Sequence, residues 1–153
     1  MEEKERKKII LSALQEAHKA FQNDEVPVGA VIFQSNTGKI IAKAHNLVEK
    51  QQNPLAHAEI QVIKKALKKI DDKFLENYSL FVTFEPCVMC AGAIAWARLD
   101  GLYYGASDPK TGAIEQGAKV FSHPQTHHKL KIEKWPNIEC GSLMTQFFKR
   151  KRQ

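Results

Sequence analysis

The sequence predicts an α/β protein in which helices cover both faces of a central sheet. Segments with apolar residues at helical spacing alternate along the chain with short apolar runs that are typical of strands. The chain has 153 residues, of which 43% are hydrophobic. This is enough to build the core of one domain, and no linker, internal repeat or low-complexity segment divides it.

The N-terminal part of the chain predicts a helix followed by a hairpin. Residues 3–23 carry apolar side chains at helical spacing among charges, so they should form an amphipathic helix. Residues 26–33 form an apolar run rich in β-branched residues, which is typical of a buried strand. A turn at 35–38 then leads to a partner strand at 39–46.

The next elements alternate between helix and strand. Asn53 followed by Pro54 is typical of a helix start, so a helix is expected from there to about Ile70. The nearly all-apolar segment 87–98 is expected to be a buried helix. The remaining predicted elements are strands at 79–84, 101–105 and 130–133, a loop at 108–116 and a helix from about 137 to the C-terminus.

The formal net charge of +6 favours a polyanionic partner such as nucleic acid, although many proteins this basic bind none. The charged N-terminus lacks the apolar core of a signal peptide, and the most apolar stretch, 90–97, is too short to span a bilayer. We therefore expect a soluble, cytoplasmic protein with no membrane partner.

Three cysteines, two of them spaced as Cys-x-x-Cys, indicate metal or redox chemistry rather than structural disulfides. Together with Cys87 and Cys90, His57 would supply the three protein ligands of a catalytic zinc site whose fourth position is open. Both cysteines fall in the first turn of their predicted helix, where the positive helix end favours thiolate over thiol. His57 falls in the first turn of the preceding helix, so its ring can reach past the helix end.

Glu59 falls inside the apolar stripe of the predicted 54–70 helix. A carboxyl group there should be desolvated, which raises its pKa and favours proton exchange near neutrality. Zinc lowers the pKa of water that it binds, and Glu59 could carry the released proton to a leaving amine. The predicted reaction is hydrolytic removal of an amino group from an electron-poor ring carbon.

Two other interpretations of the cysteines stay open. A Cys-x-x-Cys that opens a helix after a strand also describes a thioredoxin-like dithiol, although that leaves His57 and Glu59 unexplained. A structural zinc site would need a fourth protein ligand, for which Cys140 is available, although a small core residue is the more ordinary role in the C-terminal helix.

The segments His57-Ala58-Glu59 and Pro86-Cys87-Val88-Met89-Cys90 match the H-x-E…P-C-x-x-C signature of zinc-dependent nucleobase deaminases. The chain as a whole resembles the bacterial tRNA-specific adenosine deaminases (the TadA family) over almost its full length. The resembling parts are 25–31, Asn46, 57–59, 85–93, Asp108, 110–113 and Phe147-Phe148 before a basic end.

This resemblance implies a cytidine deaminase-like fold, a three-layer α/β/α sandwich with a central mixed five-stranded sheet. Residues 1–153 would form a single zinc-dependent deaminase domain with a basic C-terminal helix. The implied reaction converts adenosine to inosine at the wobble position of a tRNA anticodon loop and releases ammonia. One Zn²⁺ per subunit would be held by His57, Cys87 and Cys90, Glu59 would be the proton shuttle, and the protein would be a homodimer.

The resemblance also assigns substrate contacts. Asn46 would hydrogen-bond the flipped-out adenine, and Asp108 would contact the ribose of the preceding nucleotide. The other implied contacts are main-chain groups near Ala58 and Pro86, the pocket walls Val28 and Phe84, and Phe148 against the RNA. By pattern alone, Asn46 and Asp108 are more ordinary as turn residues, Val28 and Phe84 as core residues, and the basic end as a solvated helix end.

The chain departs from the commoner family residues at Leu55, Phe84 and His127, which affects the expected pocket shape and RNA contacts but no zinc ligand. Two other functions remain open on the sequence. One is a free nucleobase or nucleoside deaminase of the guanine or cytosine type, which needs no contact with a polyanion. The other is a zinc-stabilised RNA-binding module without activity.

Overall fold

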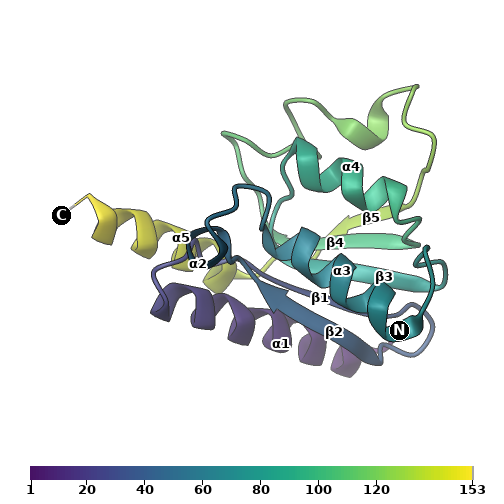
Figure 1. The fold of residues 1–153 in the computed structure, drawn as a ribbon, viewed down its shortest axis with the longest axis horizontal. Coiled ribbons are helices and arrows are strands. Elements are labelled where there is room, and N and C mark those ends of the chain that lie inside the picture. Colours follow the sequence, from purple (N-terminus) through teal and green to yellow (C-terminus); the bar gives the residue numbers. More distant parts are fainter. Residues whose placement is uncertain (153) are drawn as a thin grey trace.

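The computed structural model describes residues 1–152, which form three layers (Figure 1). The strands are β1 (Gly29–Gln34), β2 (Ile40–His45), β3 (Tyr78–Phe84), β4 (Gly101–Ala106) and β5 (Lys131–Lys134). The helices are α1 (Glu3–Gln22), α2 (Val48–Gln51), α3 (Ala58–Ile70), α4 (Val88–Trp96) and α5 (Ile138–Lys151), with a 3-10 turn η1 at Val120–Ser122. Because α1 packs with α5 on one face of the sheet and α3 with α4 on the other, the predicted α/β/α sandwich is confirmed.

The strand directions bring distant parts of the chain to one edge of the sheet. The strand order is β2-β1-β3-β4-β5, with β1 antiparallel to both of its neighbours and β3, β4 and β5 parallel to one another. β2 to β5 therefore share one direction, and β1 alone runs against them. The carboxyl ends of four strands and the amino end of β1 meet at the same edge, which is where α/β sheets place ligand sites.

β1 and β3 lie in the middle of the sheet and are covered on both faces, which explains their nearly continuous apolar sequences. Residues 30–33 of β1 are fully buried. Gly29 opens this strand beneath α1, where a Cβ would collide with the carbonyl oxygen of Ala13. The missing side chain lets the helix backbone pack directly on the strand.

The buried carboxylate of Glu16 ties α1 to the end of β2. The Glu16 carboxylate lies 2.9 Å from His45 Nδ1 and accepts a hydrogen bond of 2.9 Å from Lys19 Nζ. The hydrogen bond with His45 is the largest cause that lowers the pKa of Glu16 to about 2. The contact fixes the backbone immediately before Asn46, which is a predicted site residue.

Two sequence-based expectations about helices are wrong. The helix expected from Pro54 begins at Ala58, because Asn53 Oδ1 accepts the Leu55 N–H and closes a tight turn instead of capping a helix. The short helix α2 before that turn was not predicted.

The expectation that 87–98 forms a buried helix is also wrong in part. The side chains of Val88 and Trp96 are 58% and 71% exposed, although other parts of α4 pack with α3, with η1 and, through Ile94, with the apolar core. An apolar composition on every face of a helix does not reveal which face the same chain covers. None of the helices in residues 1–152 is both long enough and apolar enough to cross a membrane.

Candidate active site

Two helices begin at the same point and direct their first side chains into the space between them. His57 is the N-cap residue of α3 and Cys87 is the N-cap residue of α4, and both have extended backbone conformations. Neither side chain caps its own helix, so both are free to face the other helix. Cys90 reaches the same space from the first turn of α4.

The distances between these side chains match those around a tetrahedral zinc ion. His57 Nδ1 lies 3.5 Å from Cys90 Sγ and 3.7 Å from Cys87 Sγ, and the three ligand atoms lie within 4.8 Å of one another. Usual Zn–S and Zn–N bonds in a tetrahedral site separate a sulfur from a nitrogen by roughly 3.6 Å. The three side chains could therefore hold a metal ion without rearrangement.

Cys140, the alternative fourth ligand, lies elsewhere. It is buried in a cluster with Leu14, Ala17 and Leu143 between α1 and α5, where burial raises its thiol pKa to about 12. No other His, Cys, Asp or Glu side chain of residues 1–152 joins the three-ligand group. The described chain thus offers three ligands, as a catalytic site requires, rather than the four of a structural site.

The two thiols of the group have opposite tendencies to ionise. A hydrogen bond with Cys90, supported by one with His57, lowers the pKa of Cys87 to about 4. The same bond with Cys87, together with burial, raises the pKa of the Cys90 thiol. The hydrogen bond between them thus favours ionisation of Cys87 over Cys90, and a divalent cation between them would favour ionisation of both thiols.

Glu59 lies in the first turn of α3, beside the ligand group, and is only 4% exposed. Burial is the largest cause that raises the pKa of its carboxyl group to about 7. The predicted desolvation of this side chain is thus present. A carboxyl group with this pKa can take up and release protons near neutral pH.

A groove of about 1180 Å³ opens beside these groups at the edge where the strand ends meet. The predicted site residues that line it are Val28, Asn46, His57, Ala58, Glu59, Phe84, Cys87, Asp108 and Phe148. Pro86, another predicted substrate contact, is buried, and its carbonyl oxygen accepts the Ala113 N–H at 2.9 Å. The strand directions explain most of this assembly, because Val28 precedes β1, Phe84 ends β3, and the others except Phe148 follow β2, β3 or β4. Phe148 reaches the groove from α5.

Asn46 and Asp108 line the groove and also organise local turns. Asn46 Oδ1 accepts the Val48 N–H at 3.1 Å, while its amide donates to the Val26 carbonyl over a long 3.4 Å. The Asp108 carboxylate accepts the Thr111 N–H at 3.1 Å and the Thr111 hydroxyl at 2.6 Å. The turn roles weighed for both residues are therefore real, and their roles toward a substrate stay predictions.

Sequence reasoning gave no role to two buried glutamates that hold the groove walls. Glu25 accepts the N–H groups of Glu49 and Lys50 at 2.9 and 2.8 Å, which anchors α2. Glu85 accepts the Asp108 N–H at 2.9 Å. Glu25 directly precedes the apolar run 26–33, and Glu85 directly follows the predicted strand 79–84. A charged residue next to an apolar strand is the sequence signal that could have drawn attention to them.

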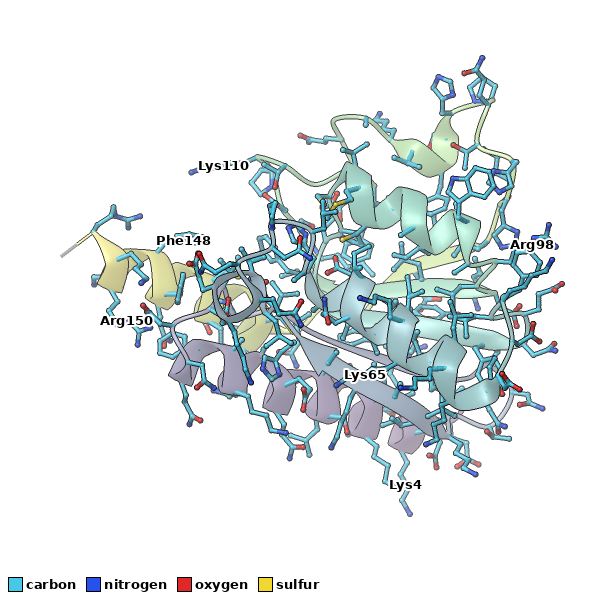
Figure 2. All side chains as sticks on the ribbon, in the orientation of Figure 1. Lys4, Lys65, Arg98, Lys110, Phe148 and Arg150 are labelled. Atoms are coloured by element: carbon cyan, nitrogen blue, oxygen red, sulfur yellow. The ribbon has the colours of Figure 1, made fainter. Side chains whose placement is uncertain are left out.

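The C-terminal helix α5 closes one side of the groove. Phe148, labelled in Figure 2, is 43% exposed and lines the groove. Its neighbour Phe147 also lines the groove but is buried. Arg150 and Lys151 donate to the Asp24 carboxylate at 3.3 and 2.6 Å. Part of the basic end thus fastens α5 to the loop after α1.

Comparison with known proteins extends beyond the metal-ligand motif. A family model described as MafB19-like deaminase matches residues 4–152. The tRNA-specific adenosine deaminase of Aquifex aeolicus is 41% identical over 140 residues, which cover 92% of this chain and 91% of that protein.

Comparison with solved structures shows that the fold is shared as well. One from a study of A-to-I editing by tRNA:A34 deaminases has a TM-score of 0.82 and 44% identity, covering 85% of this chain and 98% of that one. Guanine deaminase from Nitrosomonas europaea has a TM-score of 0.76 at 23% identity, covering 91% of this chain and 82% of that one. At this lower identity the similarity shows the fold alone.

The resemblance seen in the sequence is therefore confirmed along nearly the whole chain, and not only around His57 and the two cysteines. The chain belongs to the family of tRNA-specific adenosine deaminases.

Proposed function

We propose that this protein hydrolyses adenosine to inosine at the wobble position of a tRNA anticodon and releases ammonia. The observation that carries the proposal is the convergence of His57, Cys87 and Cys90 beside the buried carboxyl group of Glu59, at one groove. The family supports the substrate, because its members are tRNA-specific adenosine deaminases. A tRNA substrate also favours the cytoplasmic location expected from the sequence.

His57, Cys87 and Cys90 would hold one Zn²⁺ per subunit. The donor set fits this ion, because one nitrogen and two sulfurs have tetrahedral spacing and two helix N-termini favour negative charge at the same point. Zinc bound there would supply a Lewis acid that lowers the pKa of water.

Glu59 would move the protons of the reaction. Hydrolysis adds the oxygen of water to C6 of adenine and breaks the bond from C6 to the exocyclic nitrogen. Glu59 would accept a proton from the water and later donate it to the leaving nitrogen, which departs as ammonia, while the second proton of the water ends on ring nitrogen N1 of the product. A carboxyl pKa of about 7 suits both steps, because neither the acid nor the carboxylate form is strongly preferred at neutral pH.

The groove would hold the base and the nucleotide before it. Asn46 would hydrogen-bond the adenine, and its long amide contact of 3.4 Å leaves a donor that can turn toward a base. Val28 and Phe84 would flank the ring, and Asp108 would contact the preceding ribose. All four residues line the groove, which supports this arrangement.

The decisive experiment compares two substrate classes. We expect inosine in an anticodon stem–loop that contains adenosine at the wobble position, and no release of ammonia from free guanine or cytosine. A variant with Glu59→Ala should retain zinc and RNA binding but lose turnover by at least about 100-fold, because it removes the general acid–base group.

Mass spectrometry of the digested RNA measures inosine, and metal analysis of the same samples measures zinc. If only free bases react, the proposed substrate is wrong. If the wild-type protein binds RNA without any reaction, the protein is the zinc-stabilised binding module instead.

RNA binding should depend steeply on salt, because cations that contact phosphates release counterions. Lys110 and Arg152 line the groove and are the cations that we expect to contact the RNA backbone. In a Glu59→Ala background, which prevents turnover, Lys110→Gln with Arg152→Gln should reduce the slope of log K against log salt by roughly 1.4.

The matched control is Lys68→Gln on the exposed face of α3, which should leave that slope unchanged. Fluorescence anisotropy of a labelled stem–loop at several salt concentrations measures both. If the Glu59→Ala protein shows the same slope with and without the two glutamine substitutions, Lys110 and Arg152 do not contact the RNA backbone.

The exposed face of α4 supports the homodimer implied by the resemblance. Val88 and Trp96 are exposed on this helix, and a Cβ at Gly92 would have no atom within 4 Å. The face is thus apolar and open, and it belongs to the helix that carries two zinc ligands. We place the second subunit there.

Trp96→Glu should convert the dimer into monomers, because it replaces the largest exposed apolar side chain of this face with a charge. Sedimentation velocity measures the oligomeric state, and Leu11→Glu, at an exposed residue of α1, is the matched control that should remain dimeric. A Trp96→Glu protein that still sediments as a dimer would place the interface elsewhere.

A further inference from the structure

We propose that Glu85 is a positioning residue for RNA recognition, whose buried carboxylate fixes the Asp108 loop against the zinc-binding end of α4. The loop comprises residues 107–115 and forms the wall of the groove that follows β4. This inference rests on the proposed function, because the position of the loop matters only when RNA lies in the groove.

Both oxygens of the Glu85 carboxylate are occupied by this loop. One oxygen accepts the Asp108 N–H at 2.9 Å, at the start of the loop. The other accepts the N–H groups of Ile114 and Glu115 at 3.0 and 3.1 Å, at its end. Glu85 is only 4% exposed, so these charge-assisted hydrogen bonds are shielded from water and hold both ends of the loop at one anchor.

The anchor itself is fixed by the sheet. The Glu85 N–H donates to the Ala106 carbonyl at 2.9 Å, where β3 ends beside β4. Glu85 is followed by Pro86, whose carbonyl oxygen accepts the Ala113 N–H at 2.9 Å, and then by the zinc ligand Cys87. The loop is therefore joined by four hydrogen bonds to the segment that delivers α4 to the metal site.

Gly112 shows how closely the loop surrounds the carboxylate. A Cβ at this position would lie 2.5 Å from both Cδ and Oε2 of Glu85, and 2.5 Å from the Asp108 carbonyl oxygen. The Gly112 N–H also donates to that carbonyl at 3.1 Å. A side chain at 112 would push the loop away from Glu85, so the loop can reach the carboxylate only with glycine at this position.

The tip of the loop is held by bonds within the loop, from the Lys110 and Thr111 N–H groups to the Asp108 carboxylate, and, in residues 1–152, not by a bond to the sheet. At its end, the Tyr104 hydroxyl also donates to the Glu115 carboxylate, which lies far from Asp108 in the loop. Lys110 and Thr111 are exposed at the tip, and Asp108 is only half-buried. The loop lies outside α3 and α4, whose first residues carry the zinc ligands. Loss of the anchor should therefore change where Asp108 stands in the groove while it leaves the ligand group intact.

Glu85→Gln tests this with a minimal change. The new amide group replaces one acceptor oxygen with a donor that faces a backbone N–H, so at least one bond to the loop is lost. We expect KM for the anticodon stem–loop to rise at least about tenfold, with a smaller change in kcat and with unchanged zinc content. Glu76→Gln makes the same chemical change at an exposed position and should alter none of these quantities.

A double-mutant cycle separates positioning from general destabilisation. If Glu85 acts through Asp108, the protein with both Glu85→Gln and Asp108→Ala should be about as impaired as Asp108→Ala alone. Glu25→Gln loosens the opposite wall and shares no hydrogen-bond partner with Asp108. Its fold-loss of activity should therefore multiply with the fold-loss of Asp108→Ala in the protein that carries both substitutions. Multiplied losses in the Glu85 cycle, or an unchanged KM for Glu85→Gln, would overturn the proposal.

Amide hydrogen exchange tests the anchor without relying on activity. Exchange at Asp108, Ile114 and Glu115 should accelerate in Glu85→Gln, and unchanged exchange would overturn the proposal. Gly112→Ala should also raise KM and accelerate hydrogen exchange at the same three amides. This variant replaces Glu85→Gln in the test if Glu85→Gln fails to fold. A wild-type protein that makes no inosine would refute the proposed function, and the exchange rates would still decide whether Glu85 anchors the loop.

Discussion

The site depends on one geometric constraint: α3 and α4 must begin at the same edge of the sheet. His57 and Cys87 occupy the N-cap positions of these helices, so the ligand group exists only where the two helix starts meet. The sheet provides this meeting point, because β2 and β3 run in the same direction on either side of the reversed strand β1. The same arrangement brings Val28, Asn46 and Asp108 to the groove, so one topological feature sets both the metal group and its surroundings.

The buried glutamates show how environment divides one residue type into different roles. Hydrogen bonds with His45 and Lys19 lower the pKa of Glu16 to about 2, which keeps it an ion. Glu25 and Glu85 accept backbone N–H groups and hold the two walls of the groove. Glu59 is dominated by desolvation instead, which raises its pKa to about 7. Glu59 thus combines burial beside the ligand group with a raised pKa, and this combination suits it to proton transfer near neutrality.

Local patterns in the sequence predicted most elements but not their arrangement. Apolar periodicity located α1, and an apolar run followed by a turn located the hairpin. The Cys-x-x-Cys spacing together with His57 indicated the metal group that the structure brings together. The start of α3 was misplaced because Asn53-Pro54 satisfies a turn as well as a helix cap. The groove roles of Glu25 and Glu85 could not be predicted from local patterns, since their hydrogen-bond partners lie more than twenty residues away in the chain.

X-ray absorption at the zinc edge of the purified protein tests the central claim most directly, because it counts the ligand atoms around the ion. The account predicts two sulfur ligands at about 2.3 Å and two nitrogen or oxygen ligands at about 2.0–2.2 Å. The two sulfurs are Cys87 and Cys90, His57 supplies one nitrogen, and one position remains for water. Three or four sulfur ligands, or a protein that binds no zinc, would contradict a catalytic site formed by two converging helix ends.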